Sequence, residues 1–210
     1  MKVLLINGSP KEKGCTYRGL VEVAGVLEKE GIETEIFHIG AKPIQGCIGC
    51  GGCARAGQGK CIFGEDSVNI GIEKAKTADG FVFGSPVHYA AASGAITSFL
   101  DRAFYAGKKN FVYKPGAVIV SCRRGGASAA FDQLNKYFTI SNMPVVAASY
   151  WNMIHGNTPE EVEKDLEGLQ TMRVLGRNMA WLLKSIEAGK QAGVVIPEAE
   201  EIVKTNFIRG

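Results

Sequence analysis

The sequence predicts an α/β fold in which one parallel sheet is covered by helices on both faces. Five short runs rich in apolar and β-branched residues recur along the chain, and a helix-length segment separates each run from the next. Three of them are almost continuously apolar, as strands buried on both faces must be. Such alternation favours a doubly wound sheet, which binds ligands outside the carboxyl ends of its strands. The expected strands are residues 2–7, 34–39, 80–84, 116–122 and 143–149.

The segments between these strands have the spacing of amphipathic helices. In the first, Leu20, Val23, Ala24 and Leu27 stand three and four residues apart, and Gly31 follows where a helix C-cap is expected. The same pattern indicates further helices between the later strands. They are expected over residues 66–78, 93–106 and 126–140.

A longer helix is expected toward the carboxyl terminus. Thr158-Pro-Glu-Glu161 is a helix start signal, and an apolar stripe continues from there to Ile186. We expect this helix to bend near Gly168 or Gly176. The last residues have weak periodicity, so the sequence predicts a domain over residues 1–190 and a carboxyl-terminal tail over 191–210.

Composition excludes several classes of protein. Apolar residues make up 46% of the 210 residues and charged residues 21%, which is typical of a globular chain. The net charge of +3 is too small for a protein that holds nucleic acid mainly through phosphate contacts. No apolar run approaches the roughly 18 residues that cross a bilayer, and no signal-peptide pattern precedes the first strand. We therefore expect a cytoplasmic protein without a nucleic-acid or membrane partner.

The loop after the first strand, residues 7–16, has the composition of an anion site. Its glycine, serine and threonine residues precede a helix, where backbone N–H groups and the helix dipole attract negative charge. The dinucleotide pattern G-x-G-x-x-G and the triphosphate pattern G-K-[ST] are both missing, which favours a single phosphate. The alternative is that Ser9 or Thr16 merely caps the helix.

The loops after the third and fourth strands can supply further walls of the same site. Pro86 fixes a turn, His88 and Tyr89 offer flat surfaces, and small residues follow them, so a planar ring can approach the backbone. Arg123 or Arg124 can supply positive charge to such a ring or to a second phosphate. The alternative is that these are ordinary half-buried or solvated side chains.

Two motifs in this order resemble a known family. Residues 3–20, with Gly8-Ser-Pro and Cys15-Thr16, and residues 84–102, with Ser85-Pro-Val and Phe99-Leu-Asp-Arg102, resemble the NADPH-dependent FMN reductase and flavodoxin-like oxidoreductase family. The resemblance implies a flavodoxin-like five-stranded parallel sheet of order 2-1-3-4-5, bound FMN, and a homodimer or homotetramer.

The resemblance also implies which residues bind FMN. The phosphate would be held by Ser9, Lys11, Cys15 and Thr16. The isoalloxazine ring would be lined by Pro86, Val87, His88 and Tyr89. Its pyrimidine side would be closed by Ser121, Arg123, Gly125 and Gly126. Cys15 departs from the family pattern, because relatives often carry asparagine at that position.

Four cysteines gather after the second predicted strand. Cys47, Cys50, Cys53 and Cys61 form the pattern C-x2-C-x2-C-x7-C, with glycines that let the loop wrap. This tight repeat suits an iron–sulfur cubane better than tetrahedral zinc, which usually takes two separated pairs of ligands. It is similar to the compact motif of the iron–sulfur flavoproteins, a branch of the same family. A [4Fe–4S] cluster on these four cysteines, thiols without a metal, and zinc are the alternatives.

The predicted function is therefore that of an FMN-dependent oxidoreductase. Electrons would pass from NAD(P)H as co-substrate, or from a reduced protein donor, through FMN to a quinone, a flavin, an iron centre or oxygen. The flavin carries this chemistry, so the sequence predicts no catalytic acid or base. The alternatives are an electron carrier that uses FMN and a [4Fe–4S] cluster, and a regulatory module that senses redox state through its thiols.

Overall fold

In the computed structural model, a parallel sheet forms the centre of the molecule. The structure describes residues 1–201, 203 and 205, so residues 202, 204 and 206–210 of the predicted tail lie outside it. Within the described chain the parallel strands lie in the order β2-β1-β3-β5-β6, and a short strand, β4, pairs antiparallel with the end of β3. Because β6 is the fifth parallel strand along the chain, the predicted order 2-1-3-4-5 is confirmed. The strands are β1 (Lys2–Asn7), β2 (Glu33–His38), β3 (Gly80–His88), β4 (Ala91–Ala92), β5 (Gly116–Cys122) and β6 (Met153–His155).

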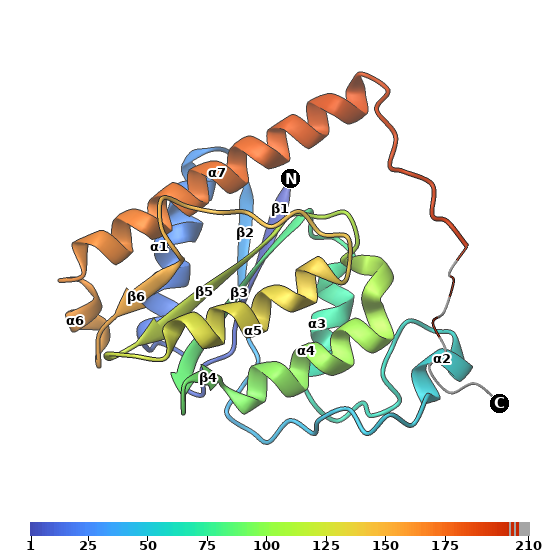
Figure 1. Ribbon diagram of the computed structural model, residues 1–210, viewed down its shortest axis with the longest axis horizontal. Helices are drawn as coiled ribbons and strands as arrows, with labels where there is room; N and C mark the ends of the chain where they lie inside the picture. Colours follow the sequence, from blue (N-terminus) through green and yellow to red (C-terminus); the bar gives the residue numbers. More distant parts are fainter. Residues whose placement is uncertain (202, 204, 206–210) are drawn as a thin grey trace.

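Helices cover both faces of this sheet (Figure 1). Helices α1 and α7 pack on one face, and α3, α4 and α5 pack on the other. A short helix, α2, and a 3-10 turn, η1, lie outside these layers. The helices are α1 (Cys15–Lys29), α2 (Gly52–Ala56), α3 (Ser67–Ala75), α4 (Gly94–Gly107), η1 (Lys108–Asn110), α5 (Ala127–Thr139), α6 (Pro159–Val162) and α7 (Leu166–Gln191).

The sheet divides the apolar interior into two cores. Along β1, Val3 and Leu5 pack toward α1 and α7, whereas Leu4 and Ile6 pack toward α3 and α4. All four side chains are at most 1% exposed, and full burial of each stabilises the fold by about 1.5–3 kcal/mol. Burial on both faces explains why the strand sequence is apolar without alternation.

The prediction of a fifth strand over residues 143–149 is wrong. This segment forms one isolated bridge at Val145, and its contacts are the Gly116 N–H donating to Pro144 at 2.9 Å and the Val146 N–H donating to Gly116 at 2.8 Å. Beyond Val146 the ladder does not continue, because Asn152 occupies the next groups of β5: its side-chain amide donates to the Val118 carbonyl at 2.9 Å, and its carbonyl accepts from the Val120 N–H at 2.9 Å. The fifth parallel strand is instead the three-residue β6, which pairs with the end of β5.

The carboxyl-terminal helix also differs from the prediction. Thr158 caps a helix as expected, with its Oγ1 accepting from the Glu161 N–H at 3.3 Å, but this helix is the short α6. Asp165 then caps α7 by accepting from the Gly168 N–H at 2.9 Å. The expected single helix is therefore interrupted between Val162 and Leu166, a few residues before Gly168, and α7 continues as one helix through Gly168 and Gly176.

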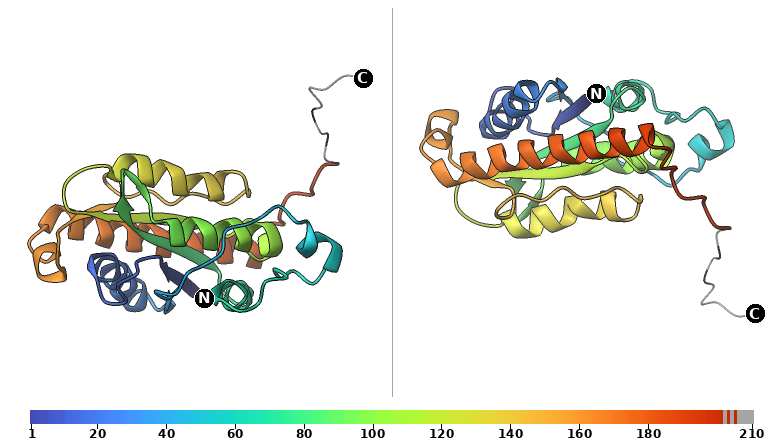
Figure 2. Two further views of the ribbon diagram at one scale, coloured as in Figure 1. Left: turned by 90° about the horizontal axis from the view of Figure 1, so that it is seen from below. Right: turned by 90° about the horizontal axis from the view of Figure 1, so that it is seen from above.

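The two views in Figure 2 show how the peripheral segments lie relative to this body. Helix α7 runs along the sheet, and α2 lies at one end of the molecule. Residues 194–201 leave α7 without regular secondary structure. Within the described part of the chain, no helix combines the length and apolarity needed to cross a bilayer.

Two glycine substitutions test the packing between helices and sheet. A Cβ at Gly25 of α1 would meet nothing within 4 Å, whereas a Cβ at Gly71 of α3 would lie 2.4 Å from Cζ of Phe99. Gly25→Ala should therefore stabilise the protein by about 0.5–1 kcal/mol through helix propensity. Gly71→Ala should destabilise it by about 1–3 kcal/mol through overpacking. Denaturant unfolding of both variants measures this, and equal changes at the two sites would contradict the described packing.

Candidate functional site

The loop after β1 leaves the N-terminus of α1 open to a ligand. Gly14 is the N-cap residue, and among the described residues no side chain caps this end. The Ser9 Oγ accepts from the Lys11 N–H at 3.1 Å, and the Thr16 and Ser121 hydroxyls lie 2.8 Å apart. The alternative in which Ser9 or Thr16 merely caps the helix is therefore wrong. The first-turn N–H groups, which no described side chain caps, form a positive end suited to a phosphate.

Buried polar contacts fix the shape of this loop. The side chain of Asn7 is fully buried, accepts from the Ser9 N–H at 3.1 Å and donates to the Glu12 carbonyl at 2.9 Å. The His38 Nε2 lies 2.8 Å from the Ser9 carbonyl oxygen, which ties the loop to the end of β2. These contacts fix the backbone of the loop beside the N-terminus of α1, where successive N–H groups can bind an anion.

A pocket of about 340 Å³ opens at the carboxyl edge of the sheet, beside this loop. It lies between the amino end of α1, the ends of β3 and β5, and the loop after β6. It brings together most of the residues predicted from the sequence. They are Ser9, Lys11, Cys15, Thr16, Pro86, Val87, His88, Ser121 and Arg123.

One wall of the pocket was missed by the sequence analysis. Residues 156–159 line it, and the Gly156 N–H donates to the Cys122 carbonyl at 3.1 Å while the Cys15 thiol donates to the Gly156 carbonyl at 3.5 Å. This loop follows β6, the strand that was placed too early along the chain. A glycine followed by Asn, Thr and Pro after a short apolar run was the available signal.

The β3–β4 turn places Tyr89 outside the pocket. Tyr89 and Ala90 both have positive φ, 49° and 58°, as a two-residue type I′ hairpin requires. Such a conformation is strained for residues other than glycine, asparagine and aspartate, and costs of order 1–3 kcal/mol for each. The Tyr89 side chain is fully exposed, and with Gly125 it lines an adjoining hollow of about 410 Å³. A Cβ at Gly126 would lie 2.7 Å from the Ala90 Cα, so glycine permits the turn to pack there.

The charges around the pocket favour an anionic ligand. Lys11 and Arg123 line it with positive charge. Burial raises the pKa of the Cys15 thiol and also that of the Cys122 thiol, which lines the same pocket. Both thiols are therefore neutral at neutral pH and add no negative charge against a phosphate.

The four clustered cysteines lie elsewhere, and in the described chain none of them lines this pocket. All four are free thiols, which is the donor chemistry of an iron–sulfur cluster. Cys61 contacts Arg102, while Cys47 is exposed. Within the described residues, however, no three Cys, His, Asp or Glu side chains lie close enough together to hold a metal ion. The donor set fits a cluster, but its placement in this structure does not assemble one.

Comparison with known proteins assigns the chain to a family. The family model described as NADPH-dependent FMN reductase matches residues 1–158. This chain belongs to that family. Membership makes it an FMN-dependent oxidoreductase.

Individual relatives agree with this assignment. An iron–sulfur flavoprotein of Methanocaldococcus jannaschii is 34% identical over 195 residues, which cover 89% of this chain and 100% of the relative. An archaeal flavodoxin structure has a TM-score of 0.58 at 15% identity, covering 88% of this chain and 99% of that one. An NAD(P)H:quinone oxidoreductase from Methanothermobacter marburgensis has a TM-score of 0.64 at 16% identity, and the match covers 85% of this chain and 96% of that one. The two structures share the flavodoxin-like fold.

Thr16→Val tests the phosphate cradle. The Thr16 side chain is 1% exposed and lines the pocket, so valine should keep the packing while removing one hydrogen-bonding group. Loss of one hydrogen bond to a charged phosphate should lower the affinity for FMN by about tenfold to a hundredfold. Riboflavin, which lacks the phosphate, should bind almost unchanged in a fluorescence titration.

A matched control is Thr139→Val, at the exposed end of α5, which should leave the affinity for both flavins unchanged. Equal losses of FMN and riboflavin affinity in Thr16→Val would show instead that Thr16 acts on folding or on the ring.

Proposed function

We propose that this protein takes electrons from NAD(P)H, or from a reduced protein donor, and passes them through bound FMN to a quinone, a flavin, an iron centre or oxygen. The observation that carries the proposal is the preformed cradle at the uncapped end of α1, beside the carboxyl ends of β3 and β5. FMN, when bound, supplies the electron-transfer chemistry. The protein's own residues bind it, orient it and control access to it.

The pocket residues divide between the two ends of the cofactor. Lys11 and Thr16 would hold the phosphate at the positive end of α1. Val87 and His88 of β3, with Ser121 of β5, would line the ring. One cradle for one phosphate favours FMN over FAD.

The hollow beside the pocket would admit the electron donor. It shares Val87, Cys122 and Arg123 with the flavin pocket and adds Arg124 and the exposed ring of Tyr89. A flat aromatic ring next to two guanidinium groups suits a nicotinamide dinucleotide, which has both a planar ring and phosphates. The strained turn that holds Tyr89 outward is consistent with this function, because such strain clusters at ligand sites.

Cofactor analysis and turnover test the proposal together. Denatured holoprotein should release FMN, and purified protein should oxidise NADH or NADPH in the presence of a quinone. Arg124→Gln should raise the KM for the nicotinamide several-fold without changing FMN affinity, because Arg124 lines the hollow and not the flavin pocket. Release of FAD would contradict the cofactor assignment. If the protein binds FMN but oxidises neither NADH nor NADPH, the electron-carrier function is the one that remains.

A second candidate function is electron transfer between FMN and a [4Fe–4S] cluster on the cysteine segment. The observation that favours it is a set of four free thiols on one glycine-rich segment, in a chain that aligns over the full length of a relative named as an iron–sulfur flavoprotein. Cluster binding would require Cys47, Cys50 and Cys53 to close around Cys61. The chain's own contribution would be these ligands and the flexibility of the segment between them.

Iron analysis tests this second candidate. After anaerobic reconstitution the protein should hold about four irons and four sulfides per chain, with broad visible absorption that bleaches in air. Cys50→Ser should abolish the iron and leave FMN bound, because the segment and the pocket use different loops. Cys15→Ser, a cysteine of the flavin pocket, serves as the control and should keep the iron. Iron near zero in wild-type protein would reject the cluster.

A further inference from the structure

Arg102 ends the Phe99-Leu-Asp-Arg102 motif, and the flavin pocket does not explain its presence. Its side chain is 1% exposed in the third turn of α4, and the described lining of the pocket does not include it. A fully buried arginine is rare and needs a full set of partners. The partners of Arg102 therefore show what it does.

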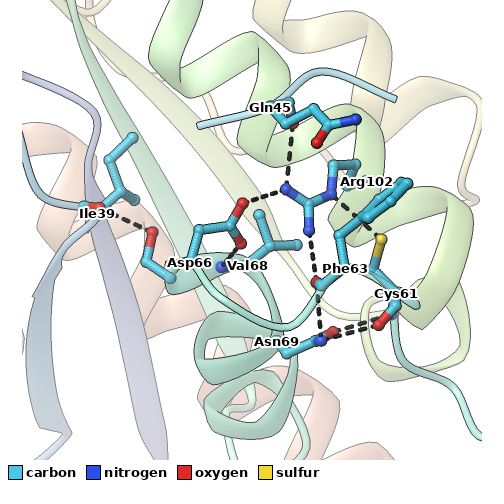
Figure 3. A network of polar contacts seen from close by, with 9 residues as sticks. Ile39, Gln45, Cys61, Phe63, Asp66, Val68, Asn69 and Arg102 are labelled. Atoms are coloured by element: carbon cyan, nitrogen blue, oxygen red, sulfur yellow. Dashed lines mark hydrogen bonds and ion pairs between the residues drawn. The ribbon is translucent and has the colours of Figure 1, made fainter. Parts of the chain in front are cut away.

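All of these partners belong to the segment that contains the four cysteines (Figure 3). The Arg102 Nε donates to the Cys61 sulfur at 3.2 Å, and its Nη2 donates to the Phe63 carbonyl at 2.7 Å. The Nη1 donates to the Gln45 carbonyl at 3.1 Å and pairs with the Asp66 carboxylate. One guanidinium thus holds the beginning and the end of residues 45–66, which we call the cysteine segment.

A second residue fixes Cys61 from the other side. Asn69 of α3 accepts from the Cys61 N–H at 2.9 Å through Oδ1 and donates to the Cys61 carbonyl at 2.9 Å through Nδ2. Asp66, the ion-pair partner of Arg102, caps α3 by accepting from the Val68 N–H at 3.1 Å. The backbone and the sulfur of Cys61 are therefore both attached to the body of the protein.

The other three cysteines have much weaker attachments. Cys47 is exposed, the Cys50 sulfur accepts from the nearby Gly52 N–H at 3.5 Å, and the Cys53 sulfur lies 3.9 Å from the Tyr105 carbonyl. Glycines with positive φ flank α2 on both sides and permit backbone rearrangement there. They are Gly49, Gly51, Gly57 and Gly59.

The donor that faces the Cys61 sulfur suits a charged sulfur. A thiol sulfur is a weak acceptor, whereas a sulfur that ligates a metal carries negative charge. An arginine side chain keeps its charge in proteins, and here it also pairs with the Asp66 carboxylate, so the Cys61 sulfur faces a charged donor. A charged donor that orients a ligand sulfur is the arrangement expected around a metal centre.

We propose that Arg102 is a positioning residue for the cysteine segment, and that it holds the Cys61 sulfur as the fixed ligand onto which Cys47, Cys50 and Cys53 close around an iron–sulfur cluster. The proposal rests on the second candidate function given above. It assigns the motif arginine to the cysteine segment and not to the flavin.

Arg102→Lys tests the proposal, because lysine keeps a positive charge beside Asp66 but cannot reach all four partners. In metal-free wild-type protein, iodoacetamide should alkylate Cys61 more slowly than Cys47, as resolved by peptide mass spectrometry. Measured at a pH high enough to ionise the thiols, so that access and not thiolate fraction decides the rate, the Cys61 rate should rise several-fold in Arg102→Lys, while the Cys53 rate stays unchanged. After anaerobic reconstitution, the variant should retain iron about tenfold to a hundredfold less tightly.

Arg55→Gln is the matched control, because Arg55 is an exposed arginine of α2 within the same segment. It should leave both iron retention and alkylation unchanged, and FMN affinity should be unchanged in both variants. Equal rises at all the segment thiols, or a loss of FMN in Arg102→Lys, would overturn the proposal in favour of a general structural role. If Arg102→Lys retained iron as tightly as the wild-type protein does, the proposal would also be overturned.

The alkylation measurement tests the positioning role of Arg102 independently of whether the protein binds a cluster. If wild-type protein takes up no iron, the proposed cluster fails, whatever Arg102 does. Equal Cys61 rates in wild type and Arg102→Lys would instead overturn the positioning role, even in a protein that holds a cluster. A wild-type Cys61 that reacts as fast as Cys47 would overturn it without any variant.

Discussion

The geometry of the proposed flavin site depends on the close contact between the loop after β1 and strand β3. The Gly8 N–H donates to the Gly84 carbonyl at 2.8 Å, and the Ser93 hydroxyl at the start of α4 donates to the Gly8 carbonyl at 2.8 Å. A Cβ at Gly8 would lie 2.6 Å from the Ile96 Cβ, so glycine is required for this approach. Because these contacts join β1, β3 and α4 at one point, the phosphate cradle and the ring-binding wall are held in fixed relation.

Helix α4 connects this point to the cysteine segment (Figure 1). Ser93 caps its amino end at the flavin site, and Arg102 holds the cysteine segment nine residues further along. At 1.5 Å per residue, the two attachments are roughly 14 Å apart along the helix axis. The flavin site and the cysteine segment therefore share one rigid element but no side chains. This separation is the physical reason to expect that each can be altered without the other.

The sequence was sufficient to predict a parallel sheet because strands buried on both faces leave an apolar pattern, whereas the strand order came from the resemblance to the family. The same reasoning failed at residues 143–149, where Met143 and Val146 are buried without regular strand pairing. Burial alone produced the apolar run there, and the three residues of β6 were too few to give a pattern of their own. The wall at residues 156–159 was missed in consequence. The outward Tyr89 was equally hidden, because Tyr-Ala is not a sequence typical of a type I′ turn.

Cysteine spacing could indicate possible metal ligands, but it could not show which of them is held in place. That information lies in contacts between residues distant in sequence, since Arg102 reaches Gln45, Cys61 and Asp66 across the fold. Removal of one partner from a buried ion pair of this kind typically costs about 3–5 kcal/mol. The attachment of the cysteine segment therefore comes from polar contacts within the protein.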